Sequence, residues 1–288
     1  MDQSNLSRRD FIRKAGLGLA VATVTLSGCG PKAAAEEKKV EATQETSEDS
    51  PNDVVDAIPP SPWSYVNLDT ELVRKKGHAE FYEGDCCYGA FAGVVGVLQE
   101  SVGFPFTQIP TKMMEFGAGG VAGWGTTCGS LIGASAAINL VTDKDTAKKL
   151  VDQLLTWYTQ TPFPSENSNQ YAVNHEFLVA EYKSDLELPQ SVSNSPLCHV
   201  SVTEWCQASG IASGAKERGE RCARLTGDVA AKAVELLNAN LAGTFSPVFT
   251  LSEETQGCMT CHTKGENFAM GQFTQGRMEC TSCHEPHQ

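Results

Sequence analysis

Four cysteines and two histidines near the C-terminus recur with one spacing. Cys258-Met-Thr-Cys261-His262 and Cys280-Thr-Ser-Cys283-His284 both follow the pattern C-x-x-C-H, which attaches a c-type haem. Each thiol of such a pair can form a thioether with one vinyl group of the porphyrin, and the adjacent His is held against the iron as an axial ligand. The two motifs therefore predict two covalently bound haem c groups. The expected thioether cysteines are Cys258, Cys261, Cys280 and Cys283, and the expected proximal iron ligands are His262 and His284.

The same four cysteines also have a spacing found in zinc ribbons, because 18 residues separate Cys261 from Cys280. His makes up only 6 of the 288 residues, so a His after both second cysteines would arise by chance about once in a few thousand cases. Haem c is attached outside the cytoplasm, and the N-terminus predicts export. These two observations favour haem over structural zinc or a pair of disulfides.

Residues 1–28 have the features of an export signal. Residues 7–13 (Ser-Arg-Arg-Asp-Phe-Ile-Arg) match the twin-arginine signature, and the uncharged stretch 15–28 is too short to span a bilayer. Leu26-Ser-Gly-Cys29 resembles a lipobox, which predicts cleavage before Cys29 and a lipid anchor on that residue. Ordinary cleavage nearby, with Cys29 incidental, is the alternative. The predicted location is the periplasm or the outer face of the cytoplasmic membrane.

The charge of the chain excludes one class of partner. The formal net charge is −13, and loss of residues 1–28, with four basic and two acidic residues, would make it about −15. Such a surface repels phosphate backbones and offers no basic footprint, so we expect no nucleic-acid partner. An external redox partner protein with a cationic surface would be steered towards it.

Beyond the signal, the sequence divides into three parts. Residues 29–62 are rich in Ala, Glu, Ser and Pro and almost free of large apolar side chains, which predicts a disordered tether. Between residues 63 and 245 apolar positions recur at helical spacing. The expected helices cover 69–78, 85–100, 131–141, 143–158 and 216–241, with a short strand near 177–179. We therefore expect a mainly α fold: a helical cysteine-bearing domain (63–245) followed by a mostly irregular dihaem c-type segment (246–288).

Six further cysteines lie in the helical domain: Cys86, Cys87, Cys128, Cys198, Cys206 and Cys222. An exported protein commonly pairs its cysteines as disulfides. The competing interpretation is an iron–sulfur cluster held by four thiolates from separate segments. Two observations favour the cluster. Several of these cysteines lie on apolar helical faces or in the glycine-rich stretch 117–133, and a cluster built in the cytoplasm would explain export of a folded protein by the twin-arginine route.

These residues carry a resemblance to known families. The helical domain, or body (residues 63–245), resembles the redox-active family named for its spaced cysteines. The positions of that pattern are occupied by Cys87, Cys128, then Cys198 or Cys206, and then Cys222. Together with the two C-x-x-C-H motifs, residues 63–288 resemble the split-Soret cytochrome c family. That resemblance implies a homodimer with two stacked haems per chain and a further iron–sulfur centre, expected to be [2Fe–2S].

Two choices within the cysteine set stay open. Cys87 shares the apolar stripe of its expected helix with Phe91, Val94 and Leu98, whereas Cys86 lies about 100° round the helix, so Cys87 is preferred and Cys86 is the alternative. Nothing in the sequence separates Cys198 from Cys206 clearly, and we take Cys198 as the candidate. The candidate cluster ligands are thus Cys87, Cys128, Cys198 and Cys222.

The sixth haem ligands are less clearly marked. The candidates are His78, His199 and His287. His199 adjoins a candidate cluster ligand and could serve there instead. If both irons are six-coordinate, no substrate site is open and the protein transfers electrons rather than acting as an enzyme. The alternative is a haem-dependent reductase of a small oxyanion or peroxide, which needs an open iron position beside acidic or cationic groups.

Overall fold

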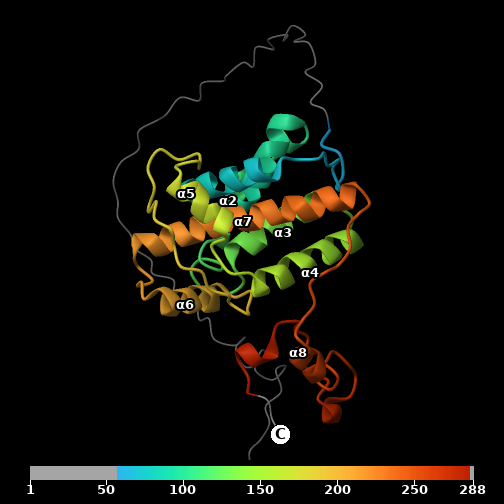
Figure 1. Ribbon diagram of the computed structural model, residues 1–288. Helices are drawn as coiled ribbons and strands as arrows, with labels where there is room; N and C mark the ends of the chain where they lie inside the picture. The colour runs from blue at the N-terminus through green and yellow to red at the C-terminus, as the bar shows by residue number, and fades with distance from the viewer. Residues whose placement is uncertain (1–56, 286–288) are drawn as a thin grey trace, which may run out of the picture. The chain divides into compact units, whose positions relative to one another are not determined.

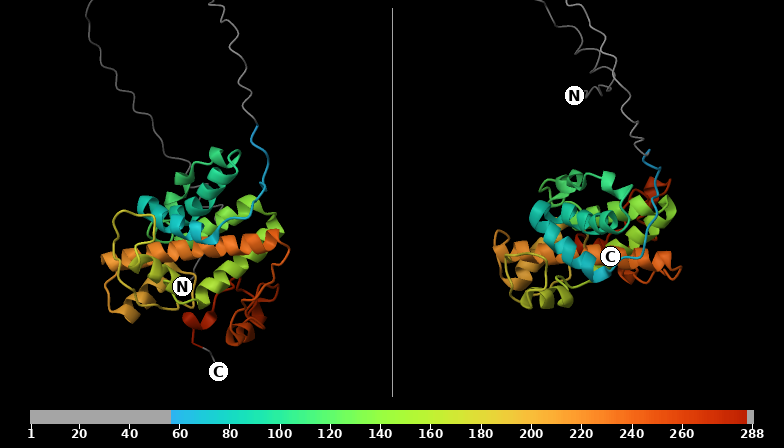
Figure 2. Two further views of the ribbon diagram at one scale, coloured as in Figure 1. Left: turned by 45° about the horizontal axis from the view of Figure 1, so that its top comes forward. Right: turned by 90° about the horizontal axis from the view of Figure 1, so that it is seen from above.

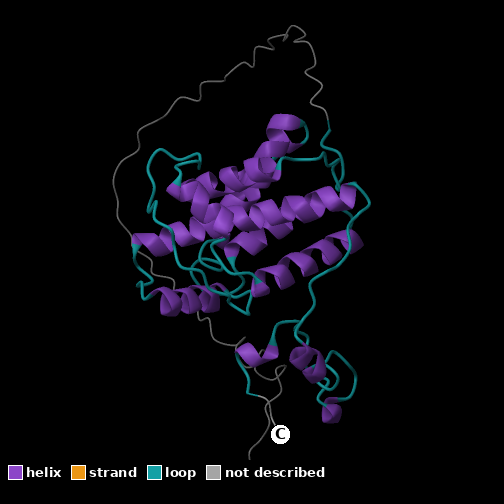
Figure 3. Cartoon of the chain, in the orientation of Figure 1, coloured by secondary structure: helices purple, strands orange, loops and turns teal. Residues whose placement is uncertain are grey.

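The computed structural model describes residues 57–285, and this part of the chain is built from helices and loops without a named β-strand (Figure 3). The expected mainly α fold is therefore confirmed. The signal, Cys29, most of the expected tether and His287 lie outside the described residues. The longer helices are α2 (Thr70–Ser101), α3 (Gly129–Val141), α4 (Lys144–Gln160), α5 (Glu166–Val173), α6 (Cys198–Ser209), α7 (Lys216–Leu241) and α8 (Glu253–Cys258). Short 3-10 turns are η1 (Phe106–Gln108), η2 (Thr111–Gly117), η3 (Phe268–Met270) and η4 (Cys280–Ser282).

Helix α2 consists of two helices joined at a sharp turn. Gly84 and Asp85 leave the helical conformation there, and Asp85 has a positive φ of 62°. A Cβ on Gly93 would lie 2.7 Å from the Cα of Gly77, so the second half folds back on the first. This turn separates the two expected helices, 69–78 and 85–100, where the sequence places the break.

Helix α7 lies against α2 in the centre of the body (Figures 1 and 2). Their contact is close because both helices have glycine there: a Cβ on Gly227 would lie 2.5 Å from the carbonyl oxygen of Arg74. Helix α3 packs against both and is largely buried, with Leu131, Ala134 and Ile138 fully covered. Together with the buried face of α4, these three helices form most of the apolar core of the body.

Two differences from the expected elements lie between residues 161 and 196. The structure places a helix, α5, in this stretch, and residues 177–179 are not a strand. Ser165 caps α5 by accepting a hydrogen bond from the amide of Ser168 at 3.2 Å. Asn169, buried on α5, binds the backbone of Leu188 through both its amide nitrogen and oxygen, which orders the polar connection without a sheet.

Buried ion pairs tie α2 to α7. Asp228 on α7 pairs with Arg74 and also accepts hydrogen bonds from the hydroxyls of Ser165 and Ser168. About two helical turns earlier on α7, Glu220 is hydrogen-bonded to Nε2 of His78 at 2.9 Å and forms an ion pair with Arg224 of the same helix at 3.0 Å.

The segment after α7 is fastened to α4. The buried side chain of Gln153 accepts hydrogen bonds from the amides of Val248 and Phe249 and donates one to the carbonyl oxygen of Phe249, at 2.8–2.9 Å. Arg277, in the C-terminal tail (residues 246–285), pairs with Asp152 at 2.7 Å. Helix α4 therefore positions the C-terminal segment.

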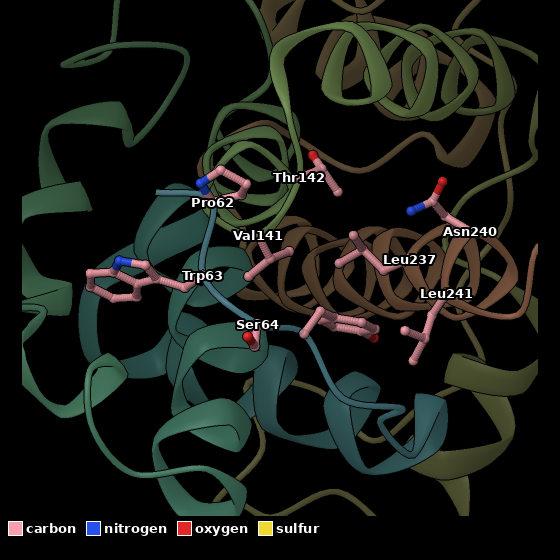
Figure 4. Close-up of a pocket in the computed structure, with 9 residues that line it drawn as sticks. Pro62, Trp63, Ser64, Val141, Thr142, Leu237, Asn240 and Leu241 are labelled. Carbon is pink, nitrogen blue, oxygen red and sulfur yellow. The ribbon is translucent and has the colours of Figure 1, made fainter. Parts of the chain in front are cut away.

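A small hollow of about 300 Å³ lies between residues 62–65 and the C-terminal ends of α3 and α7 (Figure 4). Its wall includes Trp63, Val141 and Leu237 but no cysteine, histidine or acidic residue. It therefore carries none of the chemistry expected from the sequence. None of the helices in residues 57–285 is both long enough and apolar enough to cross a membrane.

Candidate functional site

Residues of both C-x-x-C-H motifs line one cavity. Cys258 ends α8 and Cys280 begins η4, and these two short elements are in contact. The cavity has a volume of about 570 Å³. Its wall includes all four cysteines and both histidines of the motifs: Cys258, Cys261, His262, Cys280, Cys283 and His284. Met259, Phe273 and Met278 add apolar surface. Segments 18 residues apart therefore present their thiols and imidazoles to one space.

Glu279 holds the two motifs together. Its carboxylate accepts hydrogen bonds from the amide and hydroxyl of Ser252, at 2.9 and 2.6 Å, and from the hydroxyl of Thr255 at 2.6 Å. Thr255 in turn accepts a hydrogen bond from the amide of Cys280. Partial burial opposes the charge, but the hydrogen bonds from Ser252 and Thr255 outweigh it and lower the pKa of Glu279. No pattern in the sequence indicates this role of Glu279.

A loop fixes the surroundings of His262. Gly271 has a φ of +78°, and a Cβ there would lie 3.2 Å from Nδ1 of His262. The ring of Phe273 lies 5.9 Å from that of His262, centroid to centroid. Phe268 and Phe273 are themselves 80% and 61% exposed, so this side of the tail presents aromatic surface to solvent.

The structure separates the candidate sixth ligands. His78 is fully buried inside the body, with Nε2 paired to Glu220 and its ring stacked on Phe177 at 3.7 Å. Its contacts are all within the body, so this arrangement does not bring His78 to the tail cavity. His199 is exposed in the first turn of α6, next to Gly125. His287 lies outside the described residues.

Four cysteines from four segments converge in the body. Burial raises the pKa of the Cys86 thiol well above its usual value, and the nearby thiols of Cys128, Cys222 and Cys198 raise it further. Burial likewise raises the pKa of Cys198 to about 12, with Cys128 and Cys222 adding to the effect. Cys86 on α2 therefore lies near three thiols from other segments: Cys128 in the loop before α3, Cys198 on α6 and Cys222 on α7.

This group favours Cys86 over Cys87, the reverse of the preference drawn from the sequence. Cys87 lies in the main apolar core with Phe91 and Val94, and Cys128 is the one thiol of the group that raises its pKa, to about 11 after burial. Cys86 lies on the other side, beside Cys222. The apolar stripe of a helix indicates the core that it faces, and here the thiol group lies off that stripe. Cys206, further along α6, does not belong to the group.

Glycines and backbone hydrogen bonds shape the space around these thiols. A Cβ on Gly129 would lie 2.5 Å from the sulfur of Cys86, and one on Gly120 would lie 2.9 Å from the Cβ of Cys198. The amide of Cys198 donates to the carbonyl oxygen of Thr126 at 2.7 Å, which places Cys198 beside the loop that carries Cys128. The glycine-rich stretch 117–133 therefore packs closely against Cys86 and Cys198.

Two cationic groups and a phenol complete the surroundings. Nη1 of Arg218 and Nη1 of Arg221 each lie 4.0 Å from the sulfur of Cys222. The hydroxyl of Tyr158 donates to Ser201 at 2.9 Å and lies against Cys128, and burial followed by Cys128 raises the pKa of this phenol well above its usual value. The sequence pattern does not indicate a role for Arg221 or Tyr158, although Arg218 and Arg221 both lie shortly before Cys222 in Arg-Gly-Glu-Arg-Cys.

The four thiols form a set of soft donors, which suits iron–sulfur chemistry. Within residues 57–285, no three Cys, His, Asp or Glu side chains are close enough to hold one metal ion together. None of the ten cysteines in this range forms a disulfide. Four thiols beside two guanidinium groups therefore fit an anionic iron–sulfur cluster.

Comparison with known proteins supports a redox assignment. Residues 88–236 match the family described as "Putative redox-active protein (C_GCAxxG_C_C)". The matched region contains Cys128, Cys198, Cys206 and Cys222 and begins directly after Cys87.

A curated relative and a solved structure match a larger share of the chain than the family model does. The chain is 36% identical over 227 residues to split-Soret cytochrome c of Desulfovibrio desulfuricans, covering 77% of each chain. The structure described as "A novel iron centre in the split-Soret cytochrome c from Desulfovibrio desulfuricans ATCC 27774" superposes with a TM-score of 0.70 at 34% identity. That match covers 78% of this chain and 91% of the other. The chain is therefore a redox protein that belongs to the split-Soret cytochrome c family.

Proposed function

We propose that this protein is an exported dihaem cytochrome that carries electrons between an iron–sulfur centre in the body and two haem c groups in the tail. The observation that carries the proposal is the single cavity lined by all four cysteines and both histidines of the C-x-x-C-H motifs. Covalent haem attachment needs both thiols of a pair beside the same porphyrin, and both pairs line this cavity.

The haem residues follow from the motifs. Cys258 with Cys261 and Cys280 with Cys283 would form the thioethers, and His262 and His284 would bind the irons. The cavity of about 570 Å³ lies within the range of a pocket for one cofactor. The cavity would therefore not enclose two porphyrins, and part of their surface would need another cover. The exposed rings of Phe268 and Phe273 lie on the same short tail.

A second copy of the chain is the proposed cover for this surface. A tail of about 30 residues buries little apolar area by itself, and exposed aromatic groups on a soluble protein mark an interface. A homodimer would also supply sixth haem ligands across the interface, since His78 is held inside the body of its own chain. The candidates for that role are then His199 and His287.

In the body, Cys86, Cys128, Cys198 and Cys222 would hold the iron–sulfur centre, which we propose to be [2Fe–2S]. Such a cluster supplies a site that accepts and releases one electron. The residues around it exclude water and orient the ligands: Gly129 permits close packing on Cys86, and Tyr158 packs against Cys128. The solved relative is described as having an iron centre, which supports this proposal.

Export and location complete the proposal. Insertion of a cluster before export accounts for the twin-arginine signature in residues 7–13, and the lipobox-like sequence before Cys29 would anchor the protein at the outer face of the cytoplasmic membrane. The net negative charge would favour a cationic external redox partner.

Visible spectroscopy with iron and sulfide analysis tests the function. We expect two haems per chain by alkaline pyridine assay, and additional iron matched by acid-labile sulfide. Light scattering should give twice the mass of one chain. One haem per chain would overturn the dihaem assignment, and iron equal to haem content without sulfide would overturn the cluster.

The same sample separates the carrier from a reductase. Low-spin haems that do not change on addition of cyanide or nitrite support electron transfer. A high-spin fraction that binds them would instead support reduction of a small oxyanion or peroxide. A variant without the cysteines of the second motif, Cys280→Ser with Cys283→Ser, should keep one haem per chain. Its visible spectrum should lose any band splitting that arises from two neighbouring haems.

A further inference from the structure

Arg221 is a buried cation without an acidic partner. Its side chain is 2% exposed, and it forms no ion pair with any residue in the described part of the chain. Nη2 donates to the hydroxyl of Ser201 at 2.9 Å, and Nη1 lies 4.0 Å from the sulfur of Cys222. Nε is buried and has no hydrogen-bond partner among residues 57–285. An unpaired charge in a protein interior costs several kcal/mol, so the folded chain by itself does not explain why this guanidinium is buried.

Arg224, one helical turn further along α7, shows how a buried arginine is normally satisfied. It is also fully buried, but its Nε pairs with Glu220 at 3.0 Å. Its remaining nitrogens donate to Asn169, Leu186 and Ser184 at 2.7–2.8 Å. Arg74, the third arginine buried in residues 57–285, pairs with Asp228. Of these three arginines, Arg221 is the one that faces thiols instead of a carboxylate.

The negative counter-charge for Arg221 would lie where the four cysteines converge. Cys222, the neighbour of Arg221, belongs to the group with Cys86, Cys128 and Cys198. As free thiols these groups are neutral. With iron bound they become thiolates, and a [2Fe–2S] cluster with four thiolates carries a formal charge of about −2, or about −3 after taking up one electron. Bound iron would thus supply the counter-charge that the residues alone do not.

We propose that Arg221 is the counter-ion of the iron–sulfur centre, and that it makes the centre easier to reduce. This inference rests on the proposed function. The added electron raises the negative charge beside a fixed buried cation, and Coulomb attraction at short range in a medium of low dielectric constant stabilises the reduced form more than the oxidised form. Arg221 is a positioning residue for the centre, and electrons do not pass through it.

The first test compares midpoint potentials in Arg221→Met, which keeps the volume and removes the charge. Redox titration followed by electron paramagnetic resonance should show a lower potential for the centre, with the reduced-to-oxidised ratio at fixed potential falling about tenfold, or about 59 mV for one electron. The haem potentials should change much less. Arg221→Lys keeps the charge and should restore most of the potential. An unchanged potential in a fully loaded Arg221→Met protein would overturn the inference.

The second test compares the stability of Arg221→Met with that of the parent, first without iron and then with iron bound. We expect the effect of the substitution to have opposite signs in the two forms. In protein stripped of iron, Arg221→Met should unfold at the same urea concentration as the parent or a higher one, because an unpaired charge is removed. In loaded protein the same variant should be less stable and should lose iron to a chelator faster. Arg224→Met is the matched control, and it should be destabilised in both forms because it removes the arginine that forms an ion pair with the buried carboxylate of Glu220.

These outcomes separate the inference from the function beneath it. Equal destabilisation of Arg221→Met with and without iron would show a purely structural role for Arg221, while the function would stand. Absence of non-haem iron and sulfide in the parent protein would overturn both. Should Arg221→Met fail to fold, Arg221→Gln carries the same two measurements, and an unchanged potential there would also overturn the inference.

Discussion

The hydroxyl of Ser282 donates a hydrogen bond to the carbonyl oxygen of Asn194 at 2.9 Å. Ser282 lies between the two cysteines of the second haem motif, and Asn194 belongs to the body. Asn194 has a φ of 50°, a left-handed conformation that Asn tolerates better than most residues, and its amide donates to the carbonyl oxygen of Thr159 at 3.0 Å. Thr159 follows Tyr158, which packs against Cys128. Asn194 therefore links the tail to the wall of the cysteine group.

Ser282→Ala should loosen the tail without unfolding the body. One lost hydrogen bond of about 0.5–1.5 kcal/mol corresponds to about two- to tenfold faster amide exchange in residues 280–284. Hydrogen exchange read by mass spectrometry measures this, and thermal unfolding of the body should not shift. Thr281→Ala, a neighbouring change that removes no hydrogen bond within the described residues, is the control. Equal exchange in both variants would show that Asn194 does not hold the tail.

Exchange of single cysteines for serine should distinguish the two adjacent thiols of α2. Cys86→Ser should abolish most non-haem iron and acid-labile sulfide, because Cys86 lies with Cys128, Cys198 and Cys222. Cys87→Ser should retain both and lose only stability, since its sulfur packs in the apolar core. Cys206→Ser serves as a partly exposed control that should match the parent. Loss of the centre in Cys87→Ser with retention in Cys86→Ser would restore the preference drawn from the sequence.

The hydrogen bonds of Glu279 that connect the two C-x-x-C-H motifs should weaken in acid. The pKa of Glu279 is lowered below its ordinary value of 4.5 because its hydrogen bonds from Ser252 and Thr255 outweigh partial burial. A lowered pKa in the folded state means that the ionised carboxylate adds stability above pH 4.5 and loses it as pH falls through the folded-state pKa. We expect limited proteolysis of residues 252–284 to accelerate in that range.

Glu279→Gln should make the same segment susceptible at neutral pH and remove the acid transition. Glu253→Gln is the matched control, since its carboxylate makes no hydrogen bond or ion pair in the described part of the chain. A parent protein whose tail is cleaved at the same rate at pH 7 and pH 3.5 would count against this role of Glu279.

Asp228→Asn should destabilise the body strongly. The carboxylate is buried and accepts hydrogen bonds from Ser165 and Ser168 in addition to its ion pair with Arg74. Removing its charge leaves Arg74 buried with only the partly exposed Glu71, a loss of about 3–5 kcal/mol in the free energy of unfolding. Urea denaturation followed by circular dichroism measures it. Asp152→Asn, which breaks the exposed pair with Arg277, should cost less than about 1 kcal/mol.

The helices were predictable because their signals are local. Asp143 caps α4 through hydrogen bonds from the amides of Asp145 and Thr146, and the expected helix over 216–241 coincides with α7. Helix α5 was missed because its eight residues are mostly polar and short, and it is ordered by contacts of Asn169 and Ser168 with distant segments. Local periodicity cannot report such contacts.

By itself the sequence determined the haem motifs and the helical class. Both are encoded over a few residues, since a pair of thioether cysteines and an axial His must be neighbours in the chain. Which cysteines of the body converge was decided only by tertiary structure, because each comes from a different segment and the apolar face of α2 reports the core rather than the thiol group. The same holds for Arg221. Its charge is visible in the sequence, but its burial beside thiols instead of a carboxylate appears only when α6 and α7 pack together.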